Sequence, residues 1–328
     1  MRLRPRIPKQ WAALAGLASL ASWSIRIAML FIVPRNRKPS SATAWLMLTS
    51  LFPFVGLPVF LLIGSPKLSR RRRAQQRTMD DLIMSSIDTI RHLPDFVGNY
   101  DPPIPPRYAP FVRLNTNLSA LPAFAGNAVE LIPDYDTALQ RIAHEIDRAQ
   151  VFVHMEYFAL SRDEETEGVF AALERAQARG VQVRILLDHL GSRRYPTFKE
   201  TRARLKEAGI AFHLALPLRP WGAQFSRPDL RNHRKIVVID GTVGFTGSQN
   251  LIRRNYFRKD GIYYDELVVR VSGPVVIQLN AAFLTDWYSE TGIHLGLSVP
   301  GILTAPAAAG AALCQVLPSG PGFENENN

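Results

Sequence analysis

The stretch that decides the fold is "RNHRKIVVIDGTVGFTGSQN", residues 231–250. It contains two short apolar runs, "KIVVID" and "VGFTGS", joined at Asp240-Gly241. An Asp-Gly pair between two such runs favours a tight turn, so the pattern predicts a β-hairpin. His233 and Lys235 stand at the start of the first strand, and Gly247-Ser248-x-Asn250 ends the second.

These polar residues are the ones that phosphoryl chemistry uses. Side chains two residues apart on a strand point to the same side, about 6.5–7 Å apart, so His233 and Lys235 are expected to project together. A neutral imidazole is a competent nucleophile toward phosphorus, and an ammonium group neutralises phosphate oxygens. Ser248 and Asn250 could bond the same oxygens. Asp240 is expected to fix the geometry of the turn.

The preceding sequence alternates strands with helices. Strand patterns cover 128–132, 151–160, 181–188 and 210–216, and helical patterns cover 135–148, 168–179 and 197–208. Strands that alternate with helices of about 12 residues predict an α/β fold with a mixed, mostly parallel sheet covered by helices on both faces.

Charge is distributed unevenly along the chain. Residues 1–78 hold 14 Lys and Arg and no acidic residue, whereas 79–328 carry a net charge of −3. A nucleic-acid-binding protein is expected to carry its excess positive charge on the folded domain. The basic residues here flank apolar segments instead, which indicates contact with a membrane and no nucleic-acid partner.

Two apolar stretches are long enough to cross a bilayer. Trp11–Val33 contains one charge, Arg26, and Ala44–Gly64 contains none. The sequence therefore predicts two N-terminal transmembrane helices, 11–33 and 44–64. The alternative for the first is a cleaved signal peptide, with Arg2–Lys9 as its basic region and "SLAS" at 19–22 as its cleavage site. Basic residues at 1–9 and 67–77 predict a multi-pass membrane protein with both ends, and the catalytic domain, in the cytoplasm. The run at 70–77 could also rest against anionic headgroups.

Four segments follow from these patterns. We expect a membrane anchor with a basic run at 1–78, and an amphipathic and Pro-rich connector at 79–127. An α/β domain that carries the motif is expected at 128–302, followed by a segment at 303–328 that begins with a low-complexity linker.

The joint pattern H-x-K-x4-D-x6-G-S-x-N resembles the signature motif of the phospholipase D superfamily. Other stretches resemble bacterial cardiolipin synthases. The segments "FTGSQNLI" and "FLTDWYSET" are especially similar to those of the actinobacterial branch. The stretches that carry this resemblance are "AGNAVELIPD", "HMEYFAL", "DLRNHRKI" and "GPVVIQLNAAFLTDWYSETG".

The resemblance implies phosphatidyl transfer between two phosphatidylglycerol molecules, giving cardiolipin and glycerol without a metal or organic cofactor. It makes His233 the phosphohistidine nucleophile or its general-acid counterpart. Lys235 and Asn250 become phosphate ligands, with Ser248 in support. Glu266 is implied as the carboxylate that orients the imidazole, with Asp265 as the alternative. Tyr264 stands where the family usually has Trp.

Members of that family bring two such motifs together, and this sequence contains one. The resemblance implies that 128–302 is a catalytic half-domain and that 303–328 is a linker followed by the truncated start of a second half, because "CQVLPSGPGFENENN" at 314–328 resembles the opening of the family's second half. None of the other six histidines is followed two residues later by a Lys. These histidines are His92, His144, His154, His189, His213 and His294. Two copies could pair, a separate chain could supply the second motif, or the chain could be a truncated and inactive remnant. Two alternative functions also stay open: a non-catalytic membrane partner of a full-length synthase, and a dimeric single-motif nuclease.

Overall fold

The computed structural model describes residues 9–35, 39–64, 70–91, 99–100, 102–119, 121–218, 231–256, 263–295 and 306–320. The basic residues within 1–8 and 36–38, the start of the predicted linker at 303–305 and the tail at 321–328 lie outside these ranges. The chain divides into two compact units, residues 1–67 with 324–328, and residues 68–323.

The N-terminal unit contains three helices, α1 (Lys9–Ile32), α2 (Pro39–Leu51) and α3 (Pro53–Ile63). Within α1, Ala13–Ile32 is long and apolar enough to cross a membrane, and it is the one such helix among the described residues. Met29 and Val33 pack with Ala42 of α2 and Phe60 of α3 in a small buried cluster.

The prediction of a single helix over 44–64 is wrong. The stretch forms α2 and α3, which are separated at Phe52. Pro53 lacks a backbone N–H and disfavours helical dihedrals at the residue before it, and Phe52 accordingly has φ −129° and ψ 67°. The 13-residue α2 and the 11-residue α3 are each shorter than a bilayer-spanning helix needs to be.

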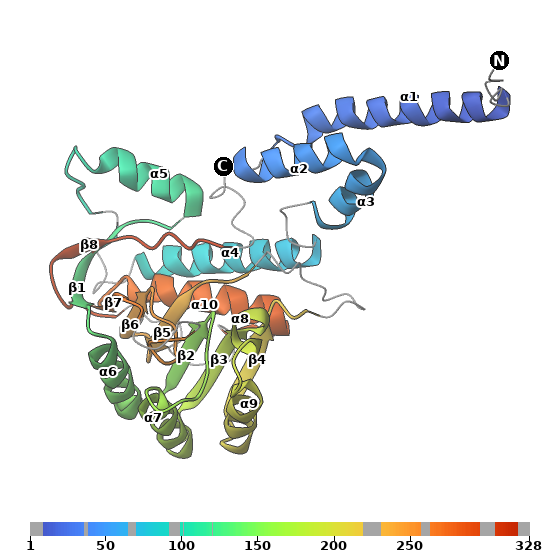
Figure 1. The fold of residues 1–328 in the computed structure, drawn as a ribbon. Helices are drawn as coiled ribbons and strands as arrows, with labels where there is room; N and C mark the ends of the chain where they lie inside the picture. The colour runs from blue at the N-terminus through green and yellow to red at the C-terminus, as the bar shows by residue number, and fades with distance from the viewer. Residues whose placement is uncertain are drawn as a thin grey trace. The chain divides into compact units, whose positions relative to one another are not determined.

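The larger unit is a sheet with helices on both faces (Figure 1). Its strands are β1 (Phe124–Ile132), β2 (Phe152–Tyr157), β3 (Gln182–Asp188), β4 (Ala211–Ala215), β5 (Lys235–Ile239), β6 (Val243–Gly247), β7 (Val268–Ser272) and β8 (Ala312–Cys314). Its helices are α4 (Arg70–Arg91), α5 (Ala109–Ser119), α6 (Tyr135–Arg148), α7 (Glu167–Ala178), α8 (His189–Arg193), α9 (Phe198–Glu207) and α10 (Val276–Thr291). The strand order is β4-β3-β2-β5-β6-β7-β1-β8.

The sheet is mixed, as predicted, but most of its pairings are antiparallel. Among the strands that the structure describes, β2 with β3 and β3 with β4 pair in parallel. These are the strands joined by helices α7 and α9, so the prediction of parallel pairing is confirmed for β2, β3 and β4. The remaining neighbours pair antiparallel, beginning with the hairpin β5–β6. Asp240 and Gly241 both have positive φ, 50° and 68°, as the tight hairpin turn requires.

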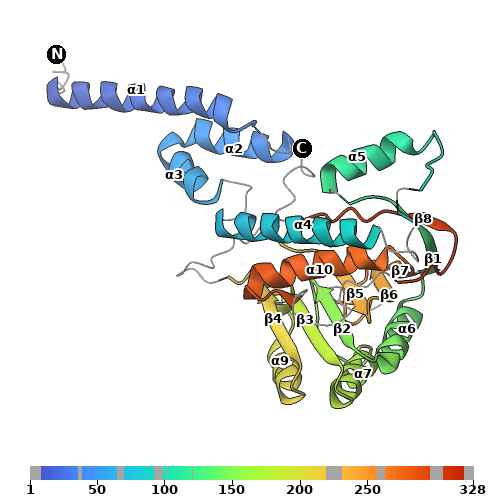
Figure 2. The same cartoon turned by 180° about the vertical axis from the view of Figure 1, so that it is seen from behind.

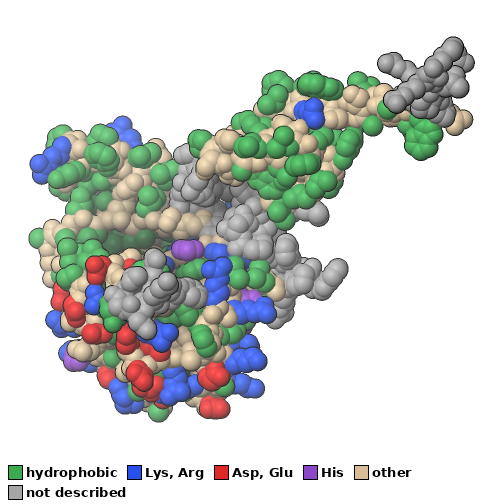
Figure 3. Space-filling view, viewed as in Figure 1, with side chains coloured by type: hydrophobic (Ala, Val, Ile, Leu, Met, Phe, Trp, Pro, Cys, Tyr) green, Lys and Arg blue, Asp and Glu red, His purple; other side chains and the backbone are tan. Residues whose placement is uncertain are grey.

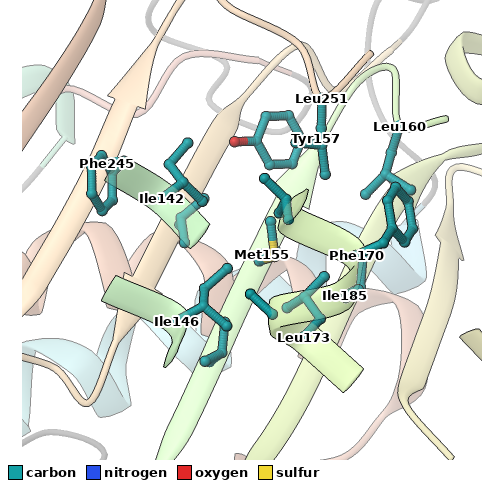
Figure 4. Close-up of a cluster of buried hydrophobic side chains, with 14 of the residues drawn as sticks. Ile142, Ile146, Met155, Tyr157, Leu160, Phe170, Leu173, Ile185, Phe245 and Leu251 are labelled. Carbon is teal, nitrogen blue, oxygen red and sulfur yellow. The ribbon is translucent and has the colours of Figure 1, made fainter. Parts of the chain in front are cut away.

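Two hydrophobic cores stabilise the sheet, one on each face. Helices α6, α7 and α9 cover the first face, whereas α10 and α4 cover the second (Figures 1 and 2). Figure 4 shows the first core, where side chains of α6 and α7 meet β2 and β3. Its labelled members include Ile142, Ile146, Met155, Phe170, Leu173 and Ile185. Buried on both faces, β2 is a rigid centre for the sheet.

The unit boundaries differ from those expected. Helix α4 packs on α10 and belongs to the larger unit, although residues 70–78 were assigned to the membrane anchor. Arg72 of the basic run is buried and forms a bidentate ion pair with Glu290, with N–O distances of 2.5 and 2.8 Å. At the other end of the chain, β8 pairs with β1, so residues 312–314 complete the sheet where a linker was expected.

Candidate active site

The polar motif residues gather at one end of the sheet. Lys235 opens β5 and pairs with Tyr157, the last residue of β2. Gly247 closes β6 and pairs with Val268, the first residue of β7. The loops that follow β2 and β6 are joined by backbone hydrogen bonds between Leu251 and both Ala159 and Ser161. The fold therefore brings four strand ends and two loops together around the motif.

His233 lies on an aromatic platform just before β5. Its ring stacks on Phe158, with centroids 3.9 Å apart and planes 20° apart. Partial burial lowers the pKa of His233, and the positive charges of Lys235 and Arg231 add in the same direction. A lowered pKa favours the neutral imidazole at pH 7, which is the form that can attack an electrophile.

Lys235 lies beside the same ring. Its Nζ is 5.7 Å from the Phe158 centroid and donates a 2.7 Å hydrogen bond to the carbonyl oxygen of His233. Burial lowers the pKa of Lys235, while the carboxylate of Glu266 acts in the opposite direction. The prediction placed these two side chains on one side of the strand, and both contact Phe158.

A buried charged network fixes the direction in which this segment points. Asn232 Nδ2 donates to Asp286 Oδ2 at 2.9 Å and also to Glu156, and Arg234 pairs with Asp286. Successive side chains of an extended segment alternate between faces, so tying Asn232 and Arg234 to α10 directs His233 and Lys235 to the other side. Desolvation, with the neighbouring Asp286 carboxylate second, raises the pKa of Glu156 well above its ordinary value.

The network was missed from the sequence, although two of its members leave a signal. Glu156 is a charged residue inside a fully buried strand, and Asp286 lies in the apolar run of α10. A second buried pair, Arg231 and Asp188 at 3.6 Å, lies nearby. Buried charges are rarely kept without a partner, so these positions could have been flagged together.

Ser248 and Asn250 hold the loop after β6. Ser248 Oγ accepts from Leu267 N at 3.0 Å, and Asn250 is buried. Asn250 Oδ1 accepts from Ala159 N at 3.1 Å, and its Nδ2 donates to the Tyr256 hydroxyl at 3.1 Å. Both side chains lie at the motif end of the sheet, but their polar atoms bond the protein itself.

Gly247 is required at the end of β6. Its φ is 152°, and a Cβ atom at this position would lie 2.1 Å from the carbonyl oxygen of Leu267. Only glycine allows the two strands to approach so closely before the Ser248 turn.

The two candidate acids differ in their surroundings. Glu266 is half-buried, lies 3.5 Å from the Tyr256 hydroxyl and raises the pKa of Lys235. Asp265 is exposed and pairs with Arg254 at 2.9 Å. Within the described part of the chain, no hydrogen bond joins either carboxylate to His233, so the expected imidazole partner is not seen in this arrangement.

Asp240 lies at the opposite end of β5 from His233. Its carboxylate accepts backbone hydrogen bonds from Gln150, Val151 and Phe152, each at 2.8 Å. This residue fastens the start of β2 to the hairpin turn. Its place in the structure is that of a positioning residue, away from the cluster around His233.

The arrangement can hold an anion next to a neutral nucleophile. A separate pocket of about 260 Å³ opens on the α10 side of this segment. His233 and Lys235 border it, together with apolar residues and with Arg231 and Arg234, which are already paired with Asp188 and Asp286. Its other lining residues include Leu279 and Ala282 of α10 and the C-terminal residues Val316–Gly320. Among the residues that the structure describes, no group of three or more His, Cys, Asp or Glu is placed to hold a metal ion.

Comparisons with known proteins agree with the motif. The family described as "Cardiolipin synthase, PLD-like domain" matches residues 142–287, and "Phospholipase_D-nuclease N-terminal" matches 24–65. The chain is 29% identical over 322 residues to cardiolipin synthase A of Proteus mirabilis (strain HI4320), covering 96% of this chain and 65% of that relative. It is 30% identical to cardiolipin synthase A of Edwardsiella ictaluri (strain 93-146), covering 96% of this chain and 64% of that relative.

The chain therefore spans a little under two thirds of the length of these curated relatives. Likeness to solved structures is more distant. The phospholipase D family member Nuc from Salmonella typhimurium has 17% identity and a TM-score of 0.40, covering 50% of this chain and 96% of that chain. NucT from Helicobacter pylori has 16% identity and a TM-score of 0.38, with the same coverage.

Proposed function

We propose a catalytic role in phospholipid synthesis for this chain, whose residues 142–287 match the family described as "Cardiolipin synthase, PLD-like domain" and which is similar to cardiolipin synthase A over 96% of its length. The proposed reaction is phosphatidyl transfer between two phosphatidylglycerol molecules, with cardiolipin and glycerol as products. The observation that carries the proposal is the pairing of His233 and Lys235 on one aromatic platform, with the pKa of the imidazole lowered.

In the first step the neutral imidazole of His233 attacks the phosphorus of one phosphatidylglycerol. The bond from phosphorus to the headgroup glycerol breaks, the phosphatidyl group stays on the imidazole, and a proton must reach the leaving oxygen. In the second step a hydroxyl of another phosphatidylglycerol attacks that phosphorus, gives up its proton, and releases free imidazole. The two steps require no oxidant or reductant.

Lys235 is proposed to stabilise the charge on the phosphoryl oxygens. Its ammonium is partly desolvated, and a charge in such a site acts more strongly than it would in water. Ser248 and Asn250 are proposed to join it as ligands, which requires them to exchange a bond within the protein for one to phosphate. The carboxylate of Glu266 favours the protonated form of Lys235. The Tyr256 hydroxyl contacts both Glu266 and Asn250.

The proton for the leaving oxygen requires a second acid. This sequence holds one H-x-K motif, and we propose that the second comes from a further copy of the chain or from another polypeptide segment that carries it. The single motif also leaves room for a non-catalytic role beside a complete synthase. That role predicts no product from the chain on its own.

We further propose that the chain acts at the cytoplasmic face of a membrane. The apolar helix α1 supports attachment to the bilayer, and the basic residues that follow the N-terminal unit support the cytoplasmic side.

The test is expression in a bacterial host that lacks its own cardiolipin synthases, with lipids examined by mass spectrometry. The wild-type chain is expected to produce cardiolipin, and His233→Ala is expected to produce none. His144→Ala is the matched control, because His144 is an exposed histidine on α6 outside the motif. Cardiolipin made by His233→Ala would disprove the mechanism. Product that appears only when a second-motif chain is co-expressed would assign the second acid to that chain.

A further inference from the structure

Helix α5 presents an apolar face that nothing in the described chain covers. None of its residues is fully buried. Phe111 and Leu114 are 65% and 56% exposed, and Tyr108, just before the helix, is 45% exposed. These three residues are spaced by three, so they lie along one side of a helical turn. We propose that α5 is an interfacial helix through which the catalytic unit binds the surface of an anionic lipid bilayer.

The charges on and around α5 favour an anionic surface. Arg107 and Arg113 flank the apolar face, and no Asp or Glu occurs from residue 102 to 129. No ion pair to either guanidinium is found among the described residues. Figure 3 shows apolar and basic side chains over α5 and no acidic ones, whereas acidic side chains gather on the lower part of the unit. An apolar face with arginines at its border is the pattern of helices that lie in the headgroup region.

The inner side of α5 is held to the end of the sheet. Gln315, directly after β8, donates through Nε2 to Thr116 Oγ1 at 3.0 Å and to Leu121 O at 2.8 Å. The same nitrogen is 3.4 Å from Val112 O. Since the polar inner side faces Gln315 and the apolar side faces outward, the orientation of α5 is defined.

This anchoring connects α5 to the motif. The residues after Gln315 run into the wall of the pocket that His233 and Lys235 border, and Val316 N is fixed by Gln278 Oε1 at 2.9 Å. A bilayer bound to α5 would therefore lie next to the chain segment that lines this pocket. A lipid substrate could then reach the pocket from the surface that α5 occupies.

A second copy of the chain is a less favourable occupant of this face. Two α5 helices packed face to face would bring Arg107 and Arg113 of both copies together, and like charges oppose such a contact. Anionic headgroups compensate the same arginines. The inference does not depend on phosphatidyl transfer, because it concerns where the unit binds.

The test uses the full chain in lipid nanodiscs and a fluorescent reporter of the environment. Cys314→Ser removes the only cysteine, and Phe111→Cys or Leu114→Cys then introduces a position for the NBD fluorophore. Ala203→Cys is the matched control, since Ala203 is exposed on α9, across the sheet from α5 (Figures 1 and 2). The discs contain phosphatidylcholine alone or with about 30% phosphatidylglycerol, and acyl-chain nitroxides serve as quenchers.

In discs with phosphatidylglycerol, both α5 labels are expected to shift to the blue and to be quenched several-fold more than the label at 203. Arg107→Gln with Arg113→Gln should reduce that quenching at least twofold, to the level in phosphatidylcholine discs. Quenching at 111 and 114 no greater than at 203 would overturn the proposal. A blue shift without lipid quenching, accompanied by energy transfer between two labelled copies, would also overturn it and would assign the face to a second chain. Neither result depends on whether cardiolipin is formed.

Discussion

The two ends of β5 carry polar residues of the same motif and use them in opposite ways. At the Asp240 end the carboxylate bonds three backbone N–H groups, and no bonding capacity is directed at a substrate. At the other end His233 is exposed, and its ring contacts Phe158 by stacking. One end of the strand is therefore fixed to the fold, while the other end carries the side chain that we propose as the nucleophile.

The difference shows how the end of the strand that carries His233 is held in place by residues other than His233. Asp240 fixes the hairpin at one end, and Asn232 and Arg234 fix the chain at the other end through Asp286. The residues in between alternate, so the side chains that face α10 provide the rigidity and those that face away remain available. Substitutions at the two kinds of position should therefore have different consequences.

After the loss of product expected for His233→Ala, the largest effect is expected at Lys235. Lys235→Ala should lower the rate per folded molecule by about 10²–10³-fold, comparable to the loss of one preorganised oxyanion donor. The melting temperature should change little, because the hydrogen bond of the ammonium within the described residues goes to a local carbonyl. Rate and melting temperature are measured on the same detergent-solubilised sample. Lys199→Ala, an exposed lysine on α9, is the control. A large drop in stability with the rate preserved would place Lys235 with Asp240 as a structural residue.

Asp240 should show the reverse. Asp240→Asn keeps a residue that tolerates positive φ but removes the charge that bonds three backbone amides. Charge-assisted hydrogen bonds contribute about 1.5–3 kcal/mol each when buried, and since this site is partly exposed we expect a total loss of about 2 kcal/mol. Denaturant unfolding measures it, with Glu207→Ala on α9 as an exposed control. Loss of rate in the folded fraction, at unchanged stability, would assign Asp240 to the chemistry.

The sequence predicted local features well because they depend on neighbouring residues. The Asp240-Gly241 turn, helix α6 at 135–148 and strand β3 at 182–188 lie where the pattern places them, to within a residue. The shared side of His233 and Lys235 follows from strand alternation alone. The division of 44–64 at Pro53 was also a local signal, but hydropathy averaged over the whole stretch hid it.

The remaining features depend on residues far apart in the chain. Glu156, Asn232 and Asp286 come from three separate parts of the chain. Glu156 and Asp286 stand out as charged residues in apolar runs, but the sequence does not show that Asn232 joins them. Whether two neighbouring strands pair parallel or antiparallel is likewise set by the path of the chain between them. The contact of Glu266 with Tyr256 depends on the path of the loop after β6, which short-range patterns do not define.

The charged network should affect the rate by an intermediate amount. Asp286→Asn keeps the shape of the side chain but weakens its hold on Arg234 and Asn232, so His233 and Lys235 are less firmly directed. Displacing a reacting group by about 1 Å can cost up to 10²-fold, and we expect about 10-fold here. The rate with a good leaving group should fall as much as with the natural substrate, because positioning is lost in both. Ser289→Ala, which removes a hydroxyl bonded within α10, is the control. A rate equal to that of the control would show that the network is dispensable for the site.

The smallest effect is a change in the pKa of His233. Measuring it separates the electrostatic effect of the Lys235 charge on the imidazole from the contacts that the Lys235 side chain makes. The pKa of His233 is lowered by burial first and by Lys235 second, so its NMR titration should lie below the ordinary value of about 6.5. Lys235→Met removes the positive charge while keeping the bulk, and the pKa of His233 should then rise.

Because the folded state favours the neutral ring, the contribution of His233 to stability is present above about pH 6.5 and is lost as the pH falls through the lowered pKa. The attacking form is also the neutral one, so the acidic limb of the rate profile should move to higher pH in Lys235→Met. An unchanged titration in that variant would mean that burial and Arg231 set the pKa, and that the ammonium acts on the phosphate and not on the nucleophile.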